Sequence, residues 1–271
     1  MGAFDTMKKR DNFTFTPFHI TGIIAILLSV VLLFKSAMLA LAPLAVFALI
    51  CAVAPFMTGF GFFLPVISRG LAGKNAVALT FDDGPSDDVT PAVLKLLSKY
   101  SAKATFFVTG ENASRHPEII RKILKQGHLI GNHSFKHDPL LMLRTRKTLF
   151  NEISECQNIL QKFKITPCAF RPPAGITNPR LRGVLAELGL FCVNWSCRGF
   201  DAGNRNVKGL SDKILKKVKP GDIILLHDVN PGSSDSEKKI LAEFEKLLKG
   251  LRNSGLNIVP LPELIEKDVM K

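Results

Sequence analysis

The sequence predicts an α/β domain with a parallel sheet, preceded by an apolar membrane segment. From Asn75 onward, short β-rich runs alternate with amphipathic helical runs, and this alternation is typical of right-handed βα units. Between Phe18 and Pro65 the chain is almost wholly apolar, with His19 and Lys35 as its only possible charges. About seven predicted strands leave two arrangements open, a doubly wound open sheet and an incomplete (β/α) barrel.

The chain divides into a basic N-terminal tail (1–17), a membrane segment (18–66) and a folded domain (67–271). A spanning helix needs about 20 apolar residues, so the membrane segment predicts two helices, at 20–34 and 38–60. A single long tilted helix is the alternative, and the apolar region is too long for a signal peptide. We therefore expect a two-span protein of the inner or cell membrane.

The tail predicts the side of the membrane on which the domain lies. Lys8, Lys9 and Arg10 precede the first span, which favours a cytoplasmic N-terminus. Two spans would return the domain to the cytoplasm, whereas one span would place it outside.

The net charge and the aromatic content of the chain indicate which classes of binding partner to expect. The net charge of +13 favours attraction to anionic membrane lipids or to an anionic envelope polymer. With one Trp and one Tyr and no interleaving of basic and aromatic residues, nucleic acid is not an expected partner. Cys51 lies in a predicted span, and the other four cysteines, at 156, 168, 192 and 197, have no CxxC spacing and are expected to be buried thiols.

The elements of the domain follow in order. Strands are predicted at 77–81, 104–109, 129–131, 168–171, 191–196, 222–227 and 257–259, and helices at 90–100, 117–126, 140–163, 179–188, 211–217 and 236–251. Pro91, Pro117 and Pro179 stand near helix starts, whereas Gly127 and Gly189 stand near helix ends.

Polar residues follow the strands where parallel α/β folds collect functional groups, at the carboxyl ends. They are Asp82 and Asp83 after the first strand, His133 after the third, Arg171 after the fourth, Asp201 in the loop after the fifth, and His227 at the end of the sixth. We expect these six side chains to share one rim.

A catalytic metal site explains the segment "HSFKH" and the adjacent aspartates. On a helix, His133 and His137 would share one face and hold a metal together with one aspartate, which leaves positions open for water and substrate. The second aspartate would then serve as a base. Unrelated surface histidines and a polar turn after a strand are the alternatives.

Three further residues fit this scheme. Arg171 can pair with the free carboxylate and keep it ionised. Asp201 can orient His227 and raise its pKa, which makes that histidine a general acid. An ordinary ion pair, a core histidine and a loop cap are the alternative interpretations.

The ordered motifs "TFDDGP", "HSFKH", "RPPAG", a Trp-containing strand before "FDA", and "ILLHD" resemble the NodB-type polysaccharide deacetylases of carbohydrate esterase family 4. The resemblance covers residues 75–271. It implies a distorted, incomplete (β/α)7-type barrel and one divalent metal ion, commonly Zn²⁺, with Co²⁺, Ni²⁺ or Mn²⁺ as alternatives.

The resemblance also implies a role for each site residue. Asp82 is similar to the catalytic base, which Arg171 steadies, and His227 is similar to the catalytic acid, which Asp201 tunes. The metal ligands of the family are similar to Asp83, His133 and His137. The Ala174 N–H is similar to the oxyanion donor, and the substrate groove is similar at Pro173, Trp195 and Arg198.

The sequence departs from the family at the rim of the groove. Ala174 stands where many members have Tyr, Ala202 where Trp is frequent, and Arg198 where an acidic residue is common. The groove is therefore expected to be roomier and more basic.

The implied activity is removal of the acetyl group from an N-acetylated amino sugar. The substrate is either an envelope polysaccharide such as peptidoglycan, or a lipid-linked or otherwise anionic acetamido sugar. A catalytically inactive, membrane-anchored glycan-binding protein is the alternative from another class. A phosphoaspartate phosphatase or a non-haem iron oxygenase would leave several of these residues without a role.

Overall fold

The computed structural model describes residues 15–230, 232 and 236–271. Lys8, Lys9 and Arg10, on which the expected orientation depends, lie outside these residues. The chain forms two compact units, one up to Ala54 and the other from Pro55 to Lys271.

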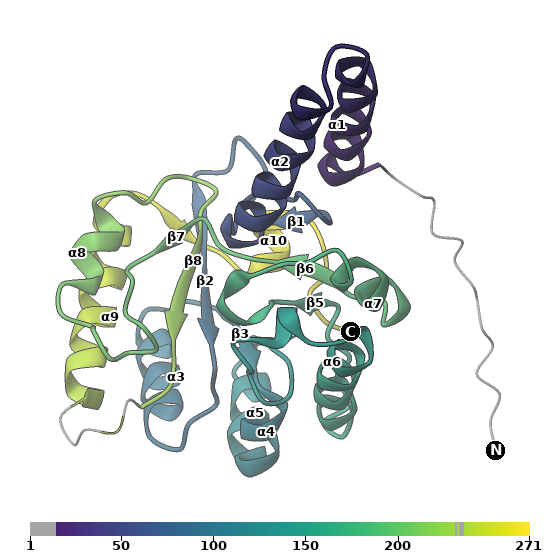
Figure 1. Ribbon diagram of the computed structural model, residues 1–271. Helices are drawn as coiled ribbons and strands as arrows, with labels where there is room; N and C mark the ends of the chain where they lie inside the picture. Colours follow the sequence, from purple (N-terminus) through teal and green to yellow (C-terminus); the bar gives the residue numbers. More distant parts are fainter. Residues whose placement is uncertain (1–14, 231, 233–235) are drawn as a thin grey trace, which may run out of the picture. The chain divides into compact units, whose positions relative to one another are not determined.

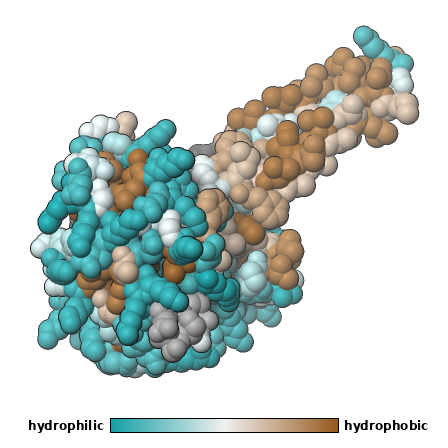
Figure 2. Space-filling view, turned by 90° about the vertical axis from the view of Figure 1, so that its left-hand side faces the viewer, coloured by the Kyte–Doolittle hydropathy of each residue, from teal (hydrophilic) through white to brown (hydrophobic). Residues whose placement is uncertain are grey.

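The first unit is a helical hairpin. It consists of α1 (Pro17–Leu33) and α2 (Ala37–Val53), and a 3-10 turn, η1 (Ala54–Phe56), continues α2. The Ser36 hydroxyl begins α2 by accepting a hydrogen bond from the Met38 N–H at 3.2 Å. Most large apolar side chains of both helices are exposed, and the face of the hairpin that Figure 2 shows is mostly hydrophobic.

Among the described residues, one helix is long and apolar enough to cross a membrane, at Ala37–Phe56. The two predicted helices are present, but α1 has only 17 residues. At about 1.5 Å per residue it is shorter than a hydrocarbon core of about 30 Å. The expectation of two full spans is therefore not confirmed.

The second unit is built on a parallel sheet (Figure 1). Its strands are β1 (Val66–Ile67), β2 (Ala76–Asp82), β3 (Ala104–Val108), β4 (Leu129–Asn132), β5 (Ala169–Phe170), β6 (Phe191–Val193), β7 (Cys197–Arg198), β8 (Ile223–His227) and β9 (Asn257–Ile258). The order is β1-β6-β5-β4-β3-β2-β8-β7, and β9 pairs with the start of β2. Within the described residues the path ends at β1 and β7 without closing.

Two apolar clusters lie on opposite faces of this sheet. The larger one includes Val93, Ile120 and Phe244 from the surrounding helices. The smaller one fills the inner face around Phe107 and Trp195, and residues of the short helix α10 (Leu261–Ile265) pack on it. The principal helices thus cover one face of the sheet, as in a partial barrel, which decides against the doubly wound arrangement.

The other helices of this unit lie outside the curved sheet (Figure 1). They are α3 (Val89–Lys99), α4 (Gly110–Arg115), α5 (Pro117–Lys125), α6 (Arg146–Gln161), α7 (Leu181–Glu187), α8 (Leu210–Leu215) and α9 (Ser236–Asn253), with 3-10 turns η2 (Leu141–Leu143) and η3 (Pro173–Gly175). The predicted helix at 140–163 begins later, because the Thr145 hydroxyl caps α6 by accepting from the Thr148 N–H at 3.2 Å.

Candidate active site

Strand register brings the predicted catalytic residues together at one edge. Asp82 is the last residue of β2 and lies opposite His227, the last residue of β8. On the other side, Asn132 at the end of β4 lies opposite Phe170 of β5. The residues that follow these positions, His133 and Arg171, therefore project at the same edge.

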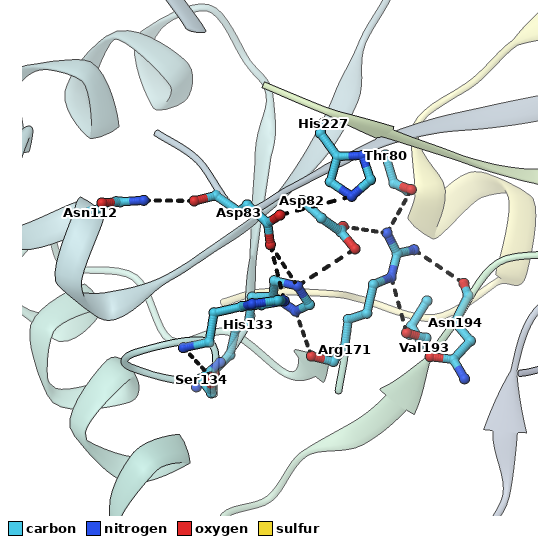
Figure 3. A network of polar contacts seen from close by, with 12 residues as sticks. Thr80, Asp82, Asp83, Asn112, His133, Ser134, Arg171, Val193, Asn194 and His227 are labelled. Atoms are coloured by element: carbon cyan, nitrogen blue, oxygen red, sulfur yellow. Dashed lines mark hydrogen bonds and ion pairs between the residues drawn. The ribbon is translucent and has the colours of Figure 1, made fainter. Parts of the chain in front are cut away.

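The two aspartates of the doublet share His133 as a neighbour but differ in their shortest contacts (Figure 3). Asp82 keeps strand geometry, whereas Asp83 has a φ of 75° and leaves the strand. Asp82 Oδ1 accepts a hydrogen bond from Arg171 Nη1 at 2.6 Å. Asp83 Oδ1 lies 3.3 Å from His133 Nε2 and 3.2 Å from His137 Nε2. The change in backbone direction separates the two carboxylates.

The expectation that His133 and His137 share one face of a helix is wrong. His133 directly follows β4, and His137 lies in a loop with a φ of 54°. The Ser134 hydroxyl accepts a hydrogen bond from the His137 N–H at 3.1 Å, which closes this loop. The two rings still meet, with centroids 4.8 Å apart.

The donor atoms of these three residues fit a divalent cation. His133 Nδ1 lies 2.7 Å from the carbonyl oxygen of Arg171; because a carbonyl only accepts, Nδ1 carries the proton and Nε2 presents its lone pair. Asp83 Oδ1 is buried without a hydrogen-bond partner. One ligand atom from each of Asp83, His133 and His137 lies within 4.8 Å of the others, a donor set suited to zinc.

The electrostatics of this cluster favour a positive charge. Burial opposes the charged form of Asp83, but His133, His137 and His227 hold the pKa of its carboxyl well below the usual range. Burial likewise opposes protonation of His133, yet Asp82 and Asp83 raise its pKa. A metal cation bound between these residues would be stabilised by the same negative carboxylates.

Arg171 is fully buried and its polar edge is satisfied by hydrogen bonds. Besides Asp82, it donates to Thr80 Oγ1 at 2.8 Å from Nη1, to the Val193 carbonyl at 3.2 Å from Nε and to the Asn194 carbonyl at 3.1 Å from Nη2. Its guanidinium lies 4.0 Å from the centroid of the Phe107 ring. The fixed guanidinium keeps the Asp82 carboxylate in one orientation.

His227 and Asp201 form a pair on the other side of the site. His227 Nδ1 lies 2.7 Å from Asp201 Oδ2, and Nε2 is 3.9 Å from Asp83 Oδ2. Burial alone would lower the pKa of His227, but the hydrogen bond and the charge of Asp201, with further contributions from Asp83 and Asp82, raise it to about 9. His227 is therefore protonated at neutral pH and can act as a general acid.

A cleft of about 620 Å³ is lined by the catalytic and metal-site residues Asp82, Asp83, His133, His137, Asp201 and His227. Of the predicted groove residues, Trp195 and Arg198 line it together with Ala174, whose φ is 54°. Pro173 is buried and is not among the lining residues, and its assignment to the groove stays a prediction. Ala202 also lines the cleft.

Sequence patterns did not reveal several residues that position the site. The Asn112 amide donates to the Asp83 carbonyl at 2.8 Å, and the buried Asn204 amide donates to the His227 carbonyl at 2.8 Å. Thr80 holds Arg171. Phe200 and Arg205 line the cleft as well. For Thr80, its place two residues before Asp82 on the same face of a strand was the available signal.

Comparisons with known proteins agree with this geometry. The family profile described as polysaccharide deacetylase matches residues 69–193. A peptidoglycan-N-acetylglucosamine deacetylase of Bacillus cereus is 37% identical over 194 residues, covering 71% of this chain and 89% of the relative. A chitooligosaccharide deacetylase of Azorhizobium caulinodans is 34% identical over 208 residues, which cover 72% of this chain and 97% of the relative.

A solved structure shows the same architecture. The crystal structure of the Bc1960 peptidoglycan N-acetylglucosamine deacetylase superimposes with a TM-score of 0.69 at 29% identity, covering 75% of this chain and 94% of that one. Some curated relatives are longer: the chain spans 41% of the length of the peptidoglycan deacetylase PgdA of Listeria monocytogenes, with 33% identity.

Proposed function

Since this chain belongs to the NodB-type polysaccharide deacetylase family, we propose that its cleft hydrolyses the acetamide of an N-acetylated amino sugar in a membrane-associated or envelope glycan. The products are acetate and a free amino sugar. The resident cofactor is one divalent cation, which we assign as Zn²⁺, held by Asp83, His133 and His137.

The side chains divide the work of amide hydrolysis between them. When bound, the cation supplies a Lewis acid that polarises the acetamide carbonyl and lowers the pKa of the attacking water. Asp82, fixed by Arg171, takes a proton from that water as it attacks the carbonyl carbon. His227 gives its proton to the nitrogen as the C–N bond breaks. We assign the Ala174 N–H, at the same cleft, to the developing oxyanion.

One observation carries this proposal: Arg171 pairs with the Asp82 carboxylate and not with Asp83, although His133 Nε2 lies 3.7 Å from Asp82 as well. A 2.6 Å contact to Arg171 holds Asp82, while Asp83 faces two imidazole nitrogens at 3.2 and 3.3 Å. A base and a metal ligand need these two environments. A glycan-binding protein without catalysis would need neither the Arg171 pair nor the His227–Asp201 pair.

We also propose that the hairpin attaches the enzyme to the cell membrane. The exposed apolar surface of α1 and α2 and the 20-residue apolar helix Ala37–Phe56 support membrane attachment. Membrane lipids are then partners of the hairpin. Substrates at the membrane surface, including lipid-linked sugars, come within reach alongside assembled polysaccharide.

The test is hydrolysis by the purified full-length chain in detergent. We expect acetate and free amine in equal amounts from N-acetylated chitooligosaccharide or peptidoglycan fragments. Chelation should abolish the reaction, and Zn²⁺ or Co²⁺ should restore it. Glycan binding that persists with no acetate release from any N-acetylated sugar, with or without added metal, would contradict the proposal and favour a binding protein.

A further inference from the structure

Two arginines of the active-site cleft form no ion pair within 4 Å among the described residues, although the charge of Asp201 acts on Arg198. Arg198 is the last residue of β7, and Arg205 lies in the loop that follows; both line the cleft. Across the part of the chain that the structure describes, neither guanidinium forms an ion pair or a hydrogen bond.

Arg198 is held in place by aromatic rings. Its guanidinium lies 4.3 Å from the centroid of the Phe200 ring and 5.5 Å from that of Trp195. Lys217 Nζ lies 4.8 Å from the same Phe200 ring. Stacking occupies the flat faces of a guanidinium and leaves the N–H groups at its edge able to bind an anion.

The loop that carries Arg205 is fixed to the catalytic strand. Phe200, Ala202 and Asn204 all have positive φ, so the loop follows a tight path. The Asn204 amide donates at 2.8 Å to the carbonyls of His227 and Val229. Because Asn204 is buried and adjacent to Arg205, that arginine is attached beside the general acid.

The carboxylates of the cleft are already matched by other groups. Asp82 pairs with Arg171, and Asp201 pairs with His227. Asp83 faces the two histidines of the metal site. Among the described charged residues that line the cleft, Arg198 and Arg205 are the two that form no ion pair, and both are positive.

We infer that this pair of arginines forms a subsite for a phosphoryl group attached to the acetamido sugar. A phosphate ester carries up to about two negative charges and acceptor oxygens that match the donor fork of arginine. A neutral glycan would leave both guanidinium groups unmatched. The inference rests on the proposed function and narrows it to a sugar phosphate or sugar diphosphate. Only the amide bond is cleaved, so the phosphoryl linkage stays intact.

The decisive experiment compares matched probes on the full-length chain in detergent. N-acetylglucosamine 1-phosphate is the anionic substrate, and methyl N-acetylglucosaminide is the neutral one. Glucosamine 1-phosphate, which has no acetyl group to lose, reports binding by calorimetry without turnover. The variants are Arg198→Gln and Arg205→Gln. Arg252→Gln, which removes an exposed charge of α9, is the matched control.

We expect wild type to favour the phosphorylated substrate in kcat/KM by about ten-fold or more, which corresponds to about 1.4 kcal/mol. Each cleft variant should reduce this preference by about ten-fold and weaken binding of glucosamine 1-phosphate, whereas Arg252→Gln should preserve both. Equal kcat/KM values for the two substrates, or binding unaffected by the variants, would overturn the subsite.

The binding measurement separates the subsite from the proposed reaction. Arginine-dependent binding of glucosamine 1-phosphate without acetate release from any substrate would retain the subsite and reject the reaction. Tighter arginine-dependent binding of N-acetylmuramic acid, a carboxylate sugar, would overturn the assignment to phosphate.

A final pair of probes identifies the source of the phosphoryl group. The two probes are a polyprenyl diphosphate-linked N-acetylglucosamine in vesicles and the soluble uridine diphosphate sugar. Arginine-dependent binding of either probe supports the subsite. The probe that binds more tightly shows whether the phosphoryl group comes from a polyprenyl carrier or from a nucleotide. Binding of neither would overturn it.

Discussion

At the scale of single residues, the site depends on how each charge is paired. Asp82 and Arg171 are both buried, and Arg171 Nη1 lies 2.6 Å from Asp82 Oδ1. Asp201 is buried, whereas its partner His227 remains partly accessible to the cleft. The first pair fixes the orientation of the proposed base, and the second raises the pKa of the proposed acid, His227.

Replacing Asp201 should change the pH profile of the enzyme. The Asp201 carboxylate opposes the effect of burial and raises the pKa of His227 to about 9. His227 is active as an acid below its pKa, so Asp201→Asn should move the alkaline limb of kcat to lower pH by at least about one unit, equivalent to about 1.4 kcal/mol. The exposed Asp212→Asn should leave this limb in place; an unmoved limb in Asp201→Asn would exclude His227 as the titrating acid.

Replacing Arg171 should destabilise the fold as well as stop catalysis. Arg171→Met leaves the Asp82 carboxylate buried without its cation, and breaking such a pair costs about 3–5 kcal/mol. Urea unfolding monitored by circular dichroism measures the loss. Arg144→Met removes an exposed partner of Asp138 and should cost less than about 1 kcal/mol. Similar losses in the two variants would contradict the role of Arg171.

At the scale of elements, the turn after β2 separates the two aspartates. A Cβ added at Gly84 would lie 2.3 Å from both carboxylate oxygens of the buried Asp228. The Asp228 carbonyl accepts hydrogen bonds from the Ser86 hydroxyl at 2.7 Å and the Thr90 hydroxyl at 3.2 Å, and Thr90 also donates to Asp228 Oδ2 at 2.6 Å. Asp228 therefore has little room to move away.

Gly84→Ala should consequently displace Asp83 and reduce both metal content and activity. A misplacement of about 1 Å in a catalytic group can cost about a hundred-fold in rate. Gly183→Ala, in α7 where an added Cβ meets no atom within 4 Å, should retain activity and gain roughly 0.5–1 kcal/mol of stability. Full metal content and activity in Gly84→Ala would show that this turn does not position the ligand.

The longer elements and the strand-end residues could be predicted from the sequence, because their signals are local. The fully buried run of β2 and the prolines and glycines near helix ends are such signals. Strands β1 and β7, with two residues each, are too short for a periodic pattern and depend on pairing with β6 and β8.

The errors within the site have the same origin. The spacing of His133 and His137 suits a helix, but the positive φ of Ser134 and His137 is set by tertiary contacts. Asn112 and Asn204 act through backbone carbonyls of distant segments, which no local pattern records.

At the scale of the whole molecule, the hairpin decides which substrates are accessible. If α1 and α2 both cross the membrane, the basic residues Lys8, Lys9 and Arg10 favour a cytoplasmic active site. We propose this orientation, which suits a lipid-linked sugar. If α2 alone crosses, the domain lies outside, where assembled polysaccharide is available.

Paired reporters fused to the C-terminus test this orientation. We expect a signal from a reporter that is active only in the cytoplasm, and none from one that is active only outside. The reversed result would mean one effective span and would make envelope polysaccharide the substrate to test.

The most direct test of the central claim compares the two aspartates of the doublet. Metal content and acetate release are measured on Asp82→Asn, Asp83→Asn and His133→Ala. Asp82→Asn should retain metal and lose acetate release, whereas Asp83→Asn and His133→Ala should lose both. Near-normal acetate release by Asp82→Asn, or full metal content in Asp83→Asn, would contradict the division of the doublet into a base and a metal ligand.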